Sequence, residues 1–269
     1  MKYSIAIGKT ISPTSPLILG GDFVQNIKYA ANLGYHAVEI HLANPDDLIE
    51  DTLKEACNRL KMEISTIGTG FMYGMEGLSL IDDSPEVQMI IMDRMHRFVD
   101  KASALRSRIT IGSIKGNIPK NKERQPYFDL LAKNLHTISE YAVGKGVLIL
   151  LEATNRLENN LLNSGKDVHD FITKYQLKNT KILMDSFHIN IEEKSVENCL
   201  KDTGDLLGYI HFADNTRHYP GAGCFDFKKF KQAILNYGYD GVLSVECLPL
   251  PDSETVATKS IQFFQETFG

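Results

Sequence analysis

Four side chains that can bind a metal or transfer protons stand where short apolar runs end. Glu152 follows VLILL, Asp185 follows KILM, His211 lies within YIHFAD, and Glu246 follows VLSV. Carboxylate and imidazole donors together suit a divalent cation such as Mn²⁺, and could also hold Co²⁺, Mg²⁺ or Zn²⁺. Because three buried carboxylates repel one another unless a cation or protons compensate, their convergence would indicate a metal site.

Each of these residues also has an ordinary structural explanation when it is taken alone. An acidic residue at a strand end often caps the next helix or forms a salt bridge, and a single histidine is commonly a partly buried polar residue. Four such residues at equivalent positions are harder to explain in that way. The hypothesis of a shared site therefore depends on whether the fold brings the four strand ends together.

The elements that would position these residues alternate between short β-rich runs and longer amphipathic segments. The apolar run 147–151 lacks alternation, which is typical of a strand buried on both faces in a parallel sheet. The predicted strands are 3–7, 36–41, 63–67, 108–111, 147–151, 181–184, 209–213 and 242–245. The predicted helices are 22–33, 45–60, 85–104, 124–143, 167–175, 191–200, 227–237 and 253–268.

Eight strands, each followed by a helix, predict an α/β fold of the closed (β/α)8 type, a TIM barrel. No linker-like or low-complexity segment interrupts the rhythm, so we expect a single domain over residues 1–269. Two connections are longer than barrel turns need, 68–84 with its four glycines and 113–123. Long loops after barrel strands lie on the ligand-binding face, so these two could form a pocket wall or a lid, or could be ordinary surface loops.

The charge balance gives no sign of a polyanionic partner. The chain has 29 Lys and Arg against 34 Asp and Glu, and its basic residues are scattered among acidic ones. A protein that binds nucleic acid usually shows a basic stripe. No run approaches the roughly 20 apolar residues of a membrane-spanning helix. We therefore expect neither nucleic acid nor a membrane as a partner.

The cysteines and the first residues indicate a cytoplasmic protein. Cys57, Cys199, Cys224 and Cys247 are widely spaced and form no CxxC pair, which is typical of reduced thiols. The chain starts MKYSIAIG, which enters a strand at once and lacks the basic segment, longer apolar segment and cleavage site of a secretory signal.

The residues around the four strand ends form motifs in a fixed order. They read EATNRLE from residue 152, MDSFHINIE from 184, HFADNTRHYPGAG from 211 and GVLSVECLP from 241. This half of the chain resembles the xylose-isomerase-like sugar (phosphate) isomerase and epimerase family, and particularly its D-tagatose and D-psicose (ketose) 3-epimerase branch. The N-terminal half resembles the family mainly through its βα rhythm. The segment HYPGAGCFDF after Arg217 is more similar to the broader sugar-phosphate isomerase group, which leaves the substrate open.

The resemblance implies a role for each matching residue. It implies metal ligation by Glu152, Asp185, His211 and Glu246, acid and base roles for Glu152 and Glu246, and substrate contacts from Glu158, His188 and Arg217. Glu158 and Arg217 could instead form surface ion pairs, and His188 could cap the start of a helix. The resemblance also implies a small-molecule sugar substrate and a homodimer or homotetramer.

The expected reaction is a reversible epimerisation at C3 of a ketose. A hydrogen next to a carbonyl is too weakly acidic for an unaided carboxylate to remove, and a metal would stabilise the developing enediolate. With glutamates on opposite sides of the carbon, one would take the proton and the other would return it to the opposite face. Glu152 and Glu246 would then exchange acid and base roles with direction.

Other activities use similar machinery. An aldose–ketose (sugar phosphate) isomerase or an inosose-type dehydratase could use the same metal site, and a non-catalytic sugar-binding barrel is a further alternative. An abasic-site endonuclease-like nuclease would need more ligands and a basic face. His41 could be an added ligand, but the fourth strand ends in Ile111-Gly112-Ser113 without a histidine. No phosphate-binding loop is evident, since the glycines at 221 and 223 are too few to define one.

Overall fold

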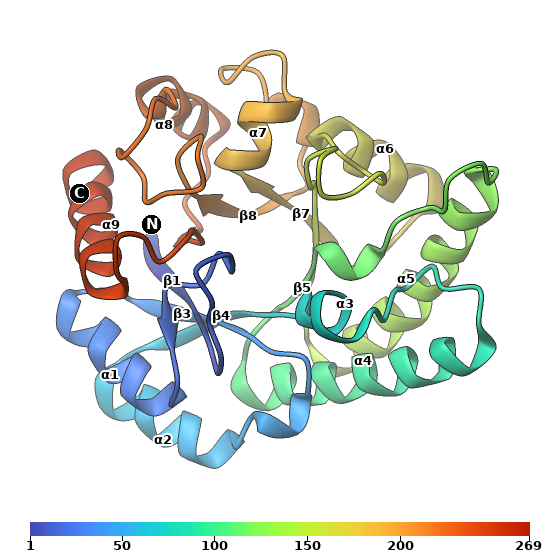
Figure 1. Ribbon diagram of the computed structural model, residues 1–269, viewed down its shortest axis with the longest axis horizontal. Coiled ribbons are helices and arrows are strands. Elements are labelled where there is room, and N and C mark those ends of the chain that lie inside the picture. Colours follow the sequence, from blue (N-terminus) through green and yellow to red (C-terminus); the bar gives the residue numbers. More distant parts are fainter.

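The computed structural model describes residues 1–269, and its parallel strands close into a barrel (Figure 1). The strands are β1 Lys2–Gly8, β2 Leu19–Gly20, β3 Ala37–His41, β4 Glu63–Gly68, β5 Ile109–Ile111, β6 Ile149–Glu152, β7 Thr180–Asp185, β8 Leu207–Phe212 and β9 Val242–Val245. The pairing runs in chain order from β1 and β3 to β9, and β1 also pairs with β9, which closes the sheet. All eight predicted strands and the predicted barrel are confirmed, and the two-residue β2, paired to the end of β1, is an addition.

Helices surround the barrel (Figure 1). They are α1 Phe23–Leu33, α2 Glu50–Leu60, α3 Phe71–Glu76, α4 Pro85–Leu105, α5 Gln125–Lys145, α6 Gly165–Tyr175, α7 Ser186–Glu192, α8 Phe227–Tyr237 and α9 Ser253–Phe268, with short 3₁₀ turns η1 Pro45–Asp47, η2 Ser113–Lys115 and η3 Lys201–Thr203. Side-chain caps fix where several of them begin. Ser164, for example, accepts from the Asp167 amide while the Asp167 carboxylate accepts from the Ser164 amide. No helix combines the length and apolarity needed to cross a membrane.

The predicted helix over 191–200 is wrong. The helix instead begins directly after β7 as α7, because the Asp185 side chain accepts a hydrogen bond from the Phe187 amide and caps it there. It ends at Glu192, and the chain continues as turns to η3. The buried Cys199 and Leu200 pack into the core from these turns. The predicted helix over 45–60 is divided into η1 and α2.

Phe212 of β8 packs against aromatic rings of the last two helices, α8 and α9. The Phe212 ring lies 5.8 Å from Phe227, 5.4 Å from Phe230 and 5.2 Å from Phe264, measured between centroids. We expect Phe212→Ala to destabilise the fold by about 3–5 kcal/mol, because it leaves a cavity among rings that cannot collapse fully. Urea denaturation followed by circular dichroism measures this. Leu235→Ala, at a half-exposed position of α8, should change stability by less than about 0.5 kcal/mol, and equal losses would contradict the prediction.

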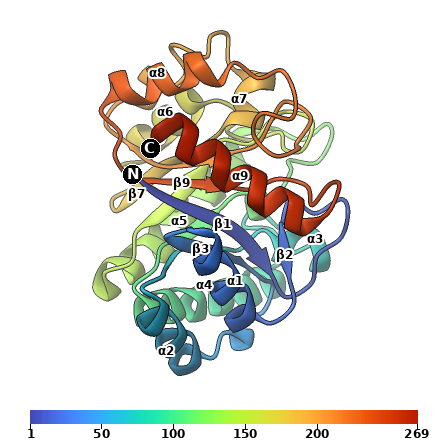
Figure 2. The same cartoon turned by 90° about the vertical axis from the view of Figure 1, so that its left-hand side faces the viewer.

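The strands present their C-terminal ends at one face of the barrel. Figure 2 shows β1 running from the N-terminus towards the side that carries β2 and α3. Because every pairing is parallel, all eight barrel strands end at this face. The structure therefore collects at one face the side chains that end these strands.

Candidate metal centre and substrate pocket

The ends of β6 to β9 bring together the four residues singled out in the sequence. Ligand atoms of Glu152, Asp185, His211 and Glu246 all lie within 4.8 Å of one another, and all four residues are buried. The sheet register explains this, because Asp185 pairs with His211 across β7 and β8, while His211 pairs with Ser244, two residues before Glu246. The separate strand ends thus form one buried cluster of three carboxylates and an imidazole.

His211 is oriented for a cation in this cluster. Its Nδ1 is buried without a hydrogen-bond partner and lies 3.7 Å from Glu152 Oε1, 3.9 Å from Asp185 Oδ2 and 3.5 Å from Glu246 Oε2. Its Nε2 lies 3.0 Å from both carboxylate oxygens of Glu39. A nitrogen without a partner that faces three carboxylates matches the donor set of a divalent metal, so these residues fit such an ion.

The pKa values of the two glutamates of the cluster, Glu152 and Glu246, are shifted in opposite directions. Burial, with the nearby charge of Glu152, raises the pKa of Glu246 to about 7 against the lowering effects of His211 and Arg217. Burial also acts to raise the pKa of Glu152, but the close approach of His211 and the charge of His188 outweigh it and lower that pKa to about 2. One carboxyl can therefore carry a proton near neutrality while the other is ionised, although a bound cation would lower both pKa values.

Arg217 reaches into the same cluster. Its guanidinium donates to Asp185 Oδ2 and to Glu246 Oε2, and it lies 4.9 Å from the centroid of the Phe187 ring. Its side chain is only 11% exposed, so these are buried ion pairs and not surface ones. Its backbone adopts a φ of 60°, in the left-handed region that is uncommon for residues other than glycine. The chain thus holds the guanidinium over two carboxylates of the cluster.

His188 and Glu158 are joined through Asn155. The Asn155 amide donates to His188 Nδ1 and to Glu158 Oε1, each at 2.8 Å. Accepting at Nδ1 leaves the His188 proton on Nε2, which lies 3.6 Å from Glu152 Oε1. His188 lies inside α7, whose cap is Asp185, so it is not a cap itself. Both predicted substrate contacts thus lie beside the cluster.

Three buried polar residues of this site, Asn155, Glu39 and Lys115, were not predicted from the sequence. Asn155 provides the bridge just described. Glu39, in the middle of β3, is fully buried and accepts from His211 Nε2, from His41 Nε2 at 2.9 Å and from the Tyr209 hydroxyl at 3.0 Å. An acid inside the apolar strand AVEIH was the available signal.

Lys115 is the third missed residue. It is fully buried, and its Nζ donates to the Glu152 carbonyl at 2.7 Å and the Thr154 hydroxyl at 3.3 Å. Burial lowers the pKa of Lys115 to about 8, although the charges of Glu152 and Glu158 oppose the shift. No sequence signal marked it, because it lies in the short turn η2 within a long loop.

His41 belongs to a second, overlapping group of donors. Atoms of Glu39, His41 and Glu246 lie within 4.8 Å of one another, and His41 Nε2 is 3.7 Å from Glu246 Oε1. His41 is therefore beside the predicted cluster. Its Nε2 donates to Glu39, so in this structure His41 supports a carboxylate instead of facing the centre of the four.

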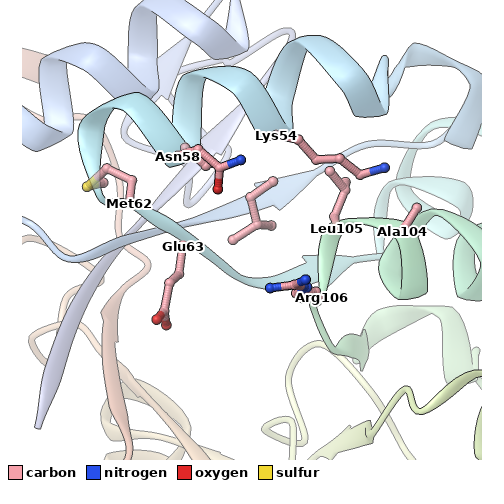
Figure 3. Close-up of a pocket in the computed structure, with 9 residues that line it drawn as sticks. Lys54, Asn58, Met62, Glu63, Ala104, Leu105 and Arg106 are labelled. Carbon is pink, nitrogen blue, oxygen red and sulfur yellow. The ribbon is translucent and has the colours of Figure 1, made fainter.

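A cavity of about 430 Å³ opens above the cluster. Glu152, Glu158 and Glu246 line it, together with the start of the long connection 68–84 and the loop after β1. The connection 68–84 therefore supplies pocket wall, whereas the connection 113–123 contributes only Ser113. A larger cavity of about 620 Å³ lies at the opposite face, between the ends of α2 and α4 and the start of β4 (Figure 3). It holds no group of metal-binding residues, so the smaller cavity is the candidate site.

Because Gly112 has no side chain, there is room beside it for the Glu152 carboxylate. A Cβ at Gly112 would lie 2.2 Å from Glu152 Oε2, so Gly112→Ala must displace that carboxylate. A misplacement of about 1 Å can cost on the order of 100-fold in rate, so we expect kcat/KM of the reaction that Glu152 serves to fall by about that factor while circular dichroism is unchanged. Gly144→Ala is the matched control, because a Cβ there meets open space on α5. Full activity in Gly112→Ala would contradict the prediction.

Comparison with known proteins places this geometry in a family. The chain is 26% identical to the L-ribulose 3-epimerase of Methylomonas sp. (strain DH-1), over 89% of each chain. It is 32% identical to the 3-dehydro-D-guloside 4-epimerase of Escherichia coli (strain K12) over 117 residues, which are 44% of this chain and 45% of that protein. The crystal structure of the D-allulose 3-epimerase from Methylomonas sp. in complex with D-allulose matches with a TM-score of 0.84 at 22% identity, over 100% of this chain and 97% of that one.

The epimerases among these relatives are isomerase-class enzymes, in agreement with the predicted enzyme class. A family model described as a xylose isomerase-like TIM barrel matches residues 27–267, which is most of the chain. The predicted family is therefore confirmed, and the chain belongs to the xylose isomerase-like TIM barrel family.

Proposed function

We propose that this chain is a divalent-metal-dependent sugar epimerase that reversibly inverts C3 of a ketose by proton transfer through a cis-enediolate. The observation that carries the proposal is the buried cluster of three carboxylates and an imidazole, two of whose glutamates, Glu152 and Glu246, line the open cavity. It provides ligands for a metal and two glutamates for proton transfer at one place. The family and the names of the epimerase relatives support the same reaction type.

Glu152, Asp185, His211 and Glu246 would hold the metal, with Mn²⁺ our first choice. When bound, a divalent ion stabilises negative charge that develops on the carbonyl and hydroxyl oxygens of a ketose, an effect worth several kcal/mol. Side chains of the protein would bind and orient the substrate. Glu158 lines the cavity, where it can accept a hydrogen bond from a substrate hydroxyl. His188 and Arg217 lie beside the carboxylates of the cluster, and their proposed role is to donate hydrogen bonds to substrate oxygens bound there.

Two carboxylates are needed because inversion requires proton removal and return on opposite faces. One of Glu152 and Glu246 takes the C3 proton, and the other, already protonated, delivers a proton from the far side. Both glutamates line the cavity, so both can reach a ketose bound there. In the reverse direction the two residues exchange roles.

The relatives' names share one chemical feature. The L-ribulose and D-psicose 3-epimerases act at the carbon next to the C2 ketone, and a 3-dehydro-glycoside 4-epimerase acts next to a C3 ketone. In each case the inverted carbon is next to a carbonyl, where an enediolate can form. This common chemistry supports epimerisation as the reaction type of the present site.

The proposal is tested by incubating the Mn²⁺-loaded protein with D-fructose in D₂O and following the products by NMR. We expect the C3 epimer to form with deuterium at C3, because the returned proton comes from a carboxyl that exchanges with solvent. Formation of an aldose that carries deuterium at C2 would instead indicate an aldose–ketose isomerase. Loss of water from an inosose would indicate a dehydratase. A chelator-treated sample is the control and should give no exchange.

A further inference from the structure

The loop after β1 gives the cavity a wall rich in hydroxyl groups. We define the hydroxyl wall as Thr10, Ser12, Thr14 and Ser15, all of which line the cavity that contains the candidate catalytic glutamates. The Ser12 hydroxyl lies 3.0 Å from that of Thr14 and 2.9 Å from that of Ser15. The loop that carries the wall lies between β1 and β2, on the same side of the barrel as α3 (Figure 2). These side chains can both donate and accept hydrogen bonds, as sugar hydroxyls do.

The lining of this cavity contains no lysine and no arginine. Its acidic members are Glu152, Glu158 and Glu246, so a phosphate dianion would face carboxylates without a cation of its own. The one imidazole of the lining, His41, donates to Glu39, and the nearby Arg217 guanidinium is paired with Asp185 and Glu246. The pocket is therefore electrostatically suited to a neutral ligand.

The cavity also has the volume of a pocket for a ligand of drug-like size. Its volume of about 430 Å³ lies in the range of pockets that enclose drug-sized ligands, roughly 300–1,000 Å³. The hydroxyl wall comes from the loop after β1, whereas Glu152 ends β6 and Glu246 follows β9, so a ligand that contacts both groups extends across two parts of the lining. Phe71 and Met75 of α3 add apolar surface to the lining, and a sugar ring can pack its C–H face against an aromatic side chain.

From these three observations we propose that the pocket takes a ketose, or keto-sugar, extended by a second neutral sugar unit, and that it discriminates against phosphorylated ketoses. The hydroxyl wall would bind the second unit while the reacting carbon stays above the carboxylate cluster. This inference rests on the proposed epimerase function for the identity of the reacting end. The discrimination itself follows from the charge and chemistry of the lining.

Two ligands that share an attachment atom test the inference. Isomaltulose carries a neutral glucosyl group on O6 of fructose, and D-fructose 6-phosphate carries a phosphate on the same oxygen. Calorimetric titration of the Mn²⁺-loaded protein should give at least a 10-fold lower Kd for isomaltulose than for D-fructose, and the weakest binding for D-fructose 6-phosphate. Equal or tighter binding of D-fructose 6-phosphate, or no gain for isomaltulose over D-fructose, would overturn the inference.

Binding and turnover are read separately, so the two proposals can fail independently. If isomaltulose binds as expected but no ketose exchanges deuterium at C3, the proposed substrate class is supported and the proposed epimerisation is contradicted. If C3 exchange occurs but D-fructose 6-phosphate binds more tightly than isomaltulose, the proposed epimerisation is supported and the proposed substrate class is contradicted.

Variants in the loop after β1 test whether the second sugar unit binds at the hydroxyl wall. Ser15→Phe should weaken isomaltulose at least 10-fold more than it weakens D-fructose, because it fills the wall. Pro13→Ala, in the same loop but outside the cavity lining, is the control and should change neither Kd. Thr10→Lys, at an exposed position that tolerates a long side chain, should tighten D-fructose 6-phosphate at least 10-fold by supplying the missing cation. If Ser15→Phe weakens both sugars equally and Thr10→Lys leaves the phosphate unchanged, the second unit does not lie at this wall.

Discussion

Replacement of either Glu152 or Glu246 by glutamine is expected to lower the rate of epimerisation by about 10²–10⁴-fold, the usual contribution of a positioned acid or base. Glutamine keeps the size of the side chain and one oxygen, but it can neither take nor deliver a proton near neutrality. Since inversion needs a proton-transfer group on each face of C3, loss of either glutamate stops interconversion. Both residues lie in the one cluster at the cavity floor, so each substitution acts at the reacting carbon.

The two variants should differ in what they still exchange. With one glutamate left, only the epimer whose C3 hydrogen faces that glutamate can lose it to solvent. In D₂O, each variant should therefore incorporate deuterium into one epimer alone, and the two variants should label opposite epimers. Glu140→Gln, at an exposed position of α5, is the control and should behave as the unaltered protein. Full interconversion in both glutamine variants would rule out the two-glutamate mechanism.

The fold was predictable because its signals are local. Unbroken apolar runs marked the buried strands, and the helix starts predicted at 22 and 253 agree with the structure to within one residue. The helix after β7 was misplaced because the decisive contact, the Asp185 carboxylate capping the Phe187 amide, competes with periodicity a few residues later. The strand β2 was missed because two residues carry no periodic signal.

The site was predictable only where position in the barrel carries information. Glu152 and Glu246 end their strands, and a closed parallel barrel brings strand ends to one face. Glu39 was not found because its partners come from distant strands, with His211 172 residues further along the chain. Lys115 was not predicted for the same reason, since its burial depends on how a loop folds over β6. The roles of all the site residues stay predictions that the proposed experiments test.

Glu39→Gln is expected to weaken metal binding by about 10–100-fold, because Glu39 orients a ligand without touching the centre itself. Its carboxylate accepts from His211 Nε2 at 3.0 Å through both oxygens, which keeps the proton on Nε2 and aims Nδ1 at the three carboxylates. An ionised partner also makes the imidazole a stronger donor to a cation. A neutral amide would keep at most one of these contacts and would remove the charge.

Metal affinity separates this role from simple packing. Titration of the metal-free protein with Mn²⁺, followed by the loss of the free-ion EPR signal, gives the Kd directly and does not depend on turnover. Tyr209→Phe is the matched control, because it removes the 3.0 Å hydrogen bond to the same carboxylate but leaves both contacts with His211. We expect a much smaller change in Kd for Tyr209→Phe than for Glu39→Gln. If Glu39→Gln lowers thermal stability but leaves the Kd unchanged, then Glu39 serves the packing of β3 against β8 and does not position His211.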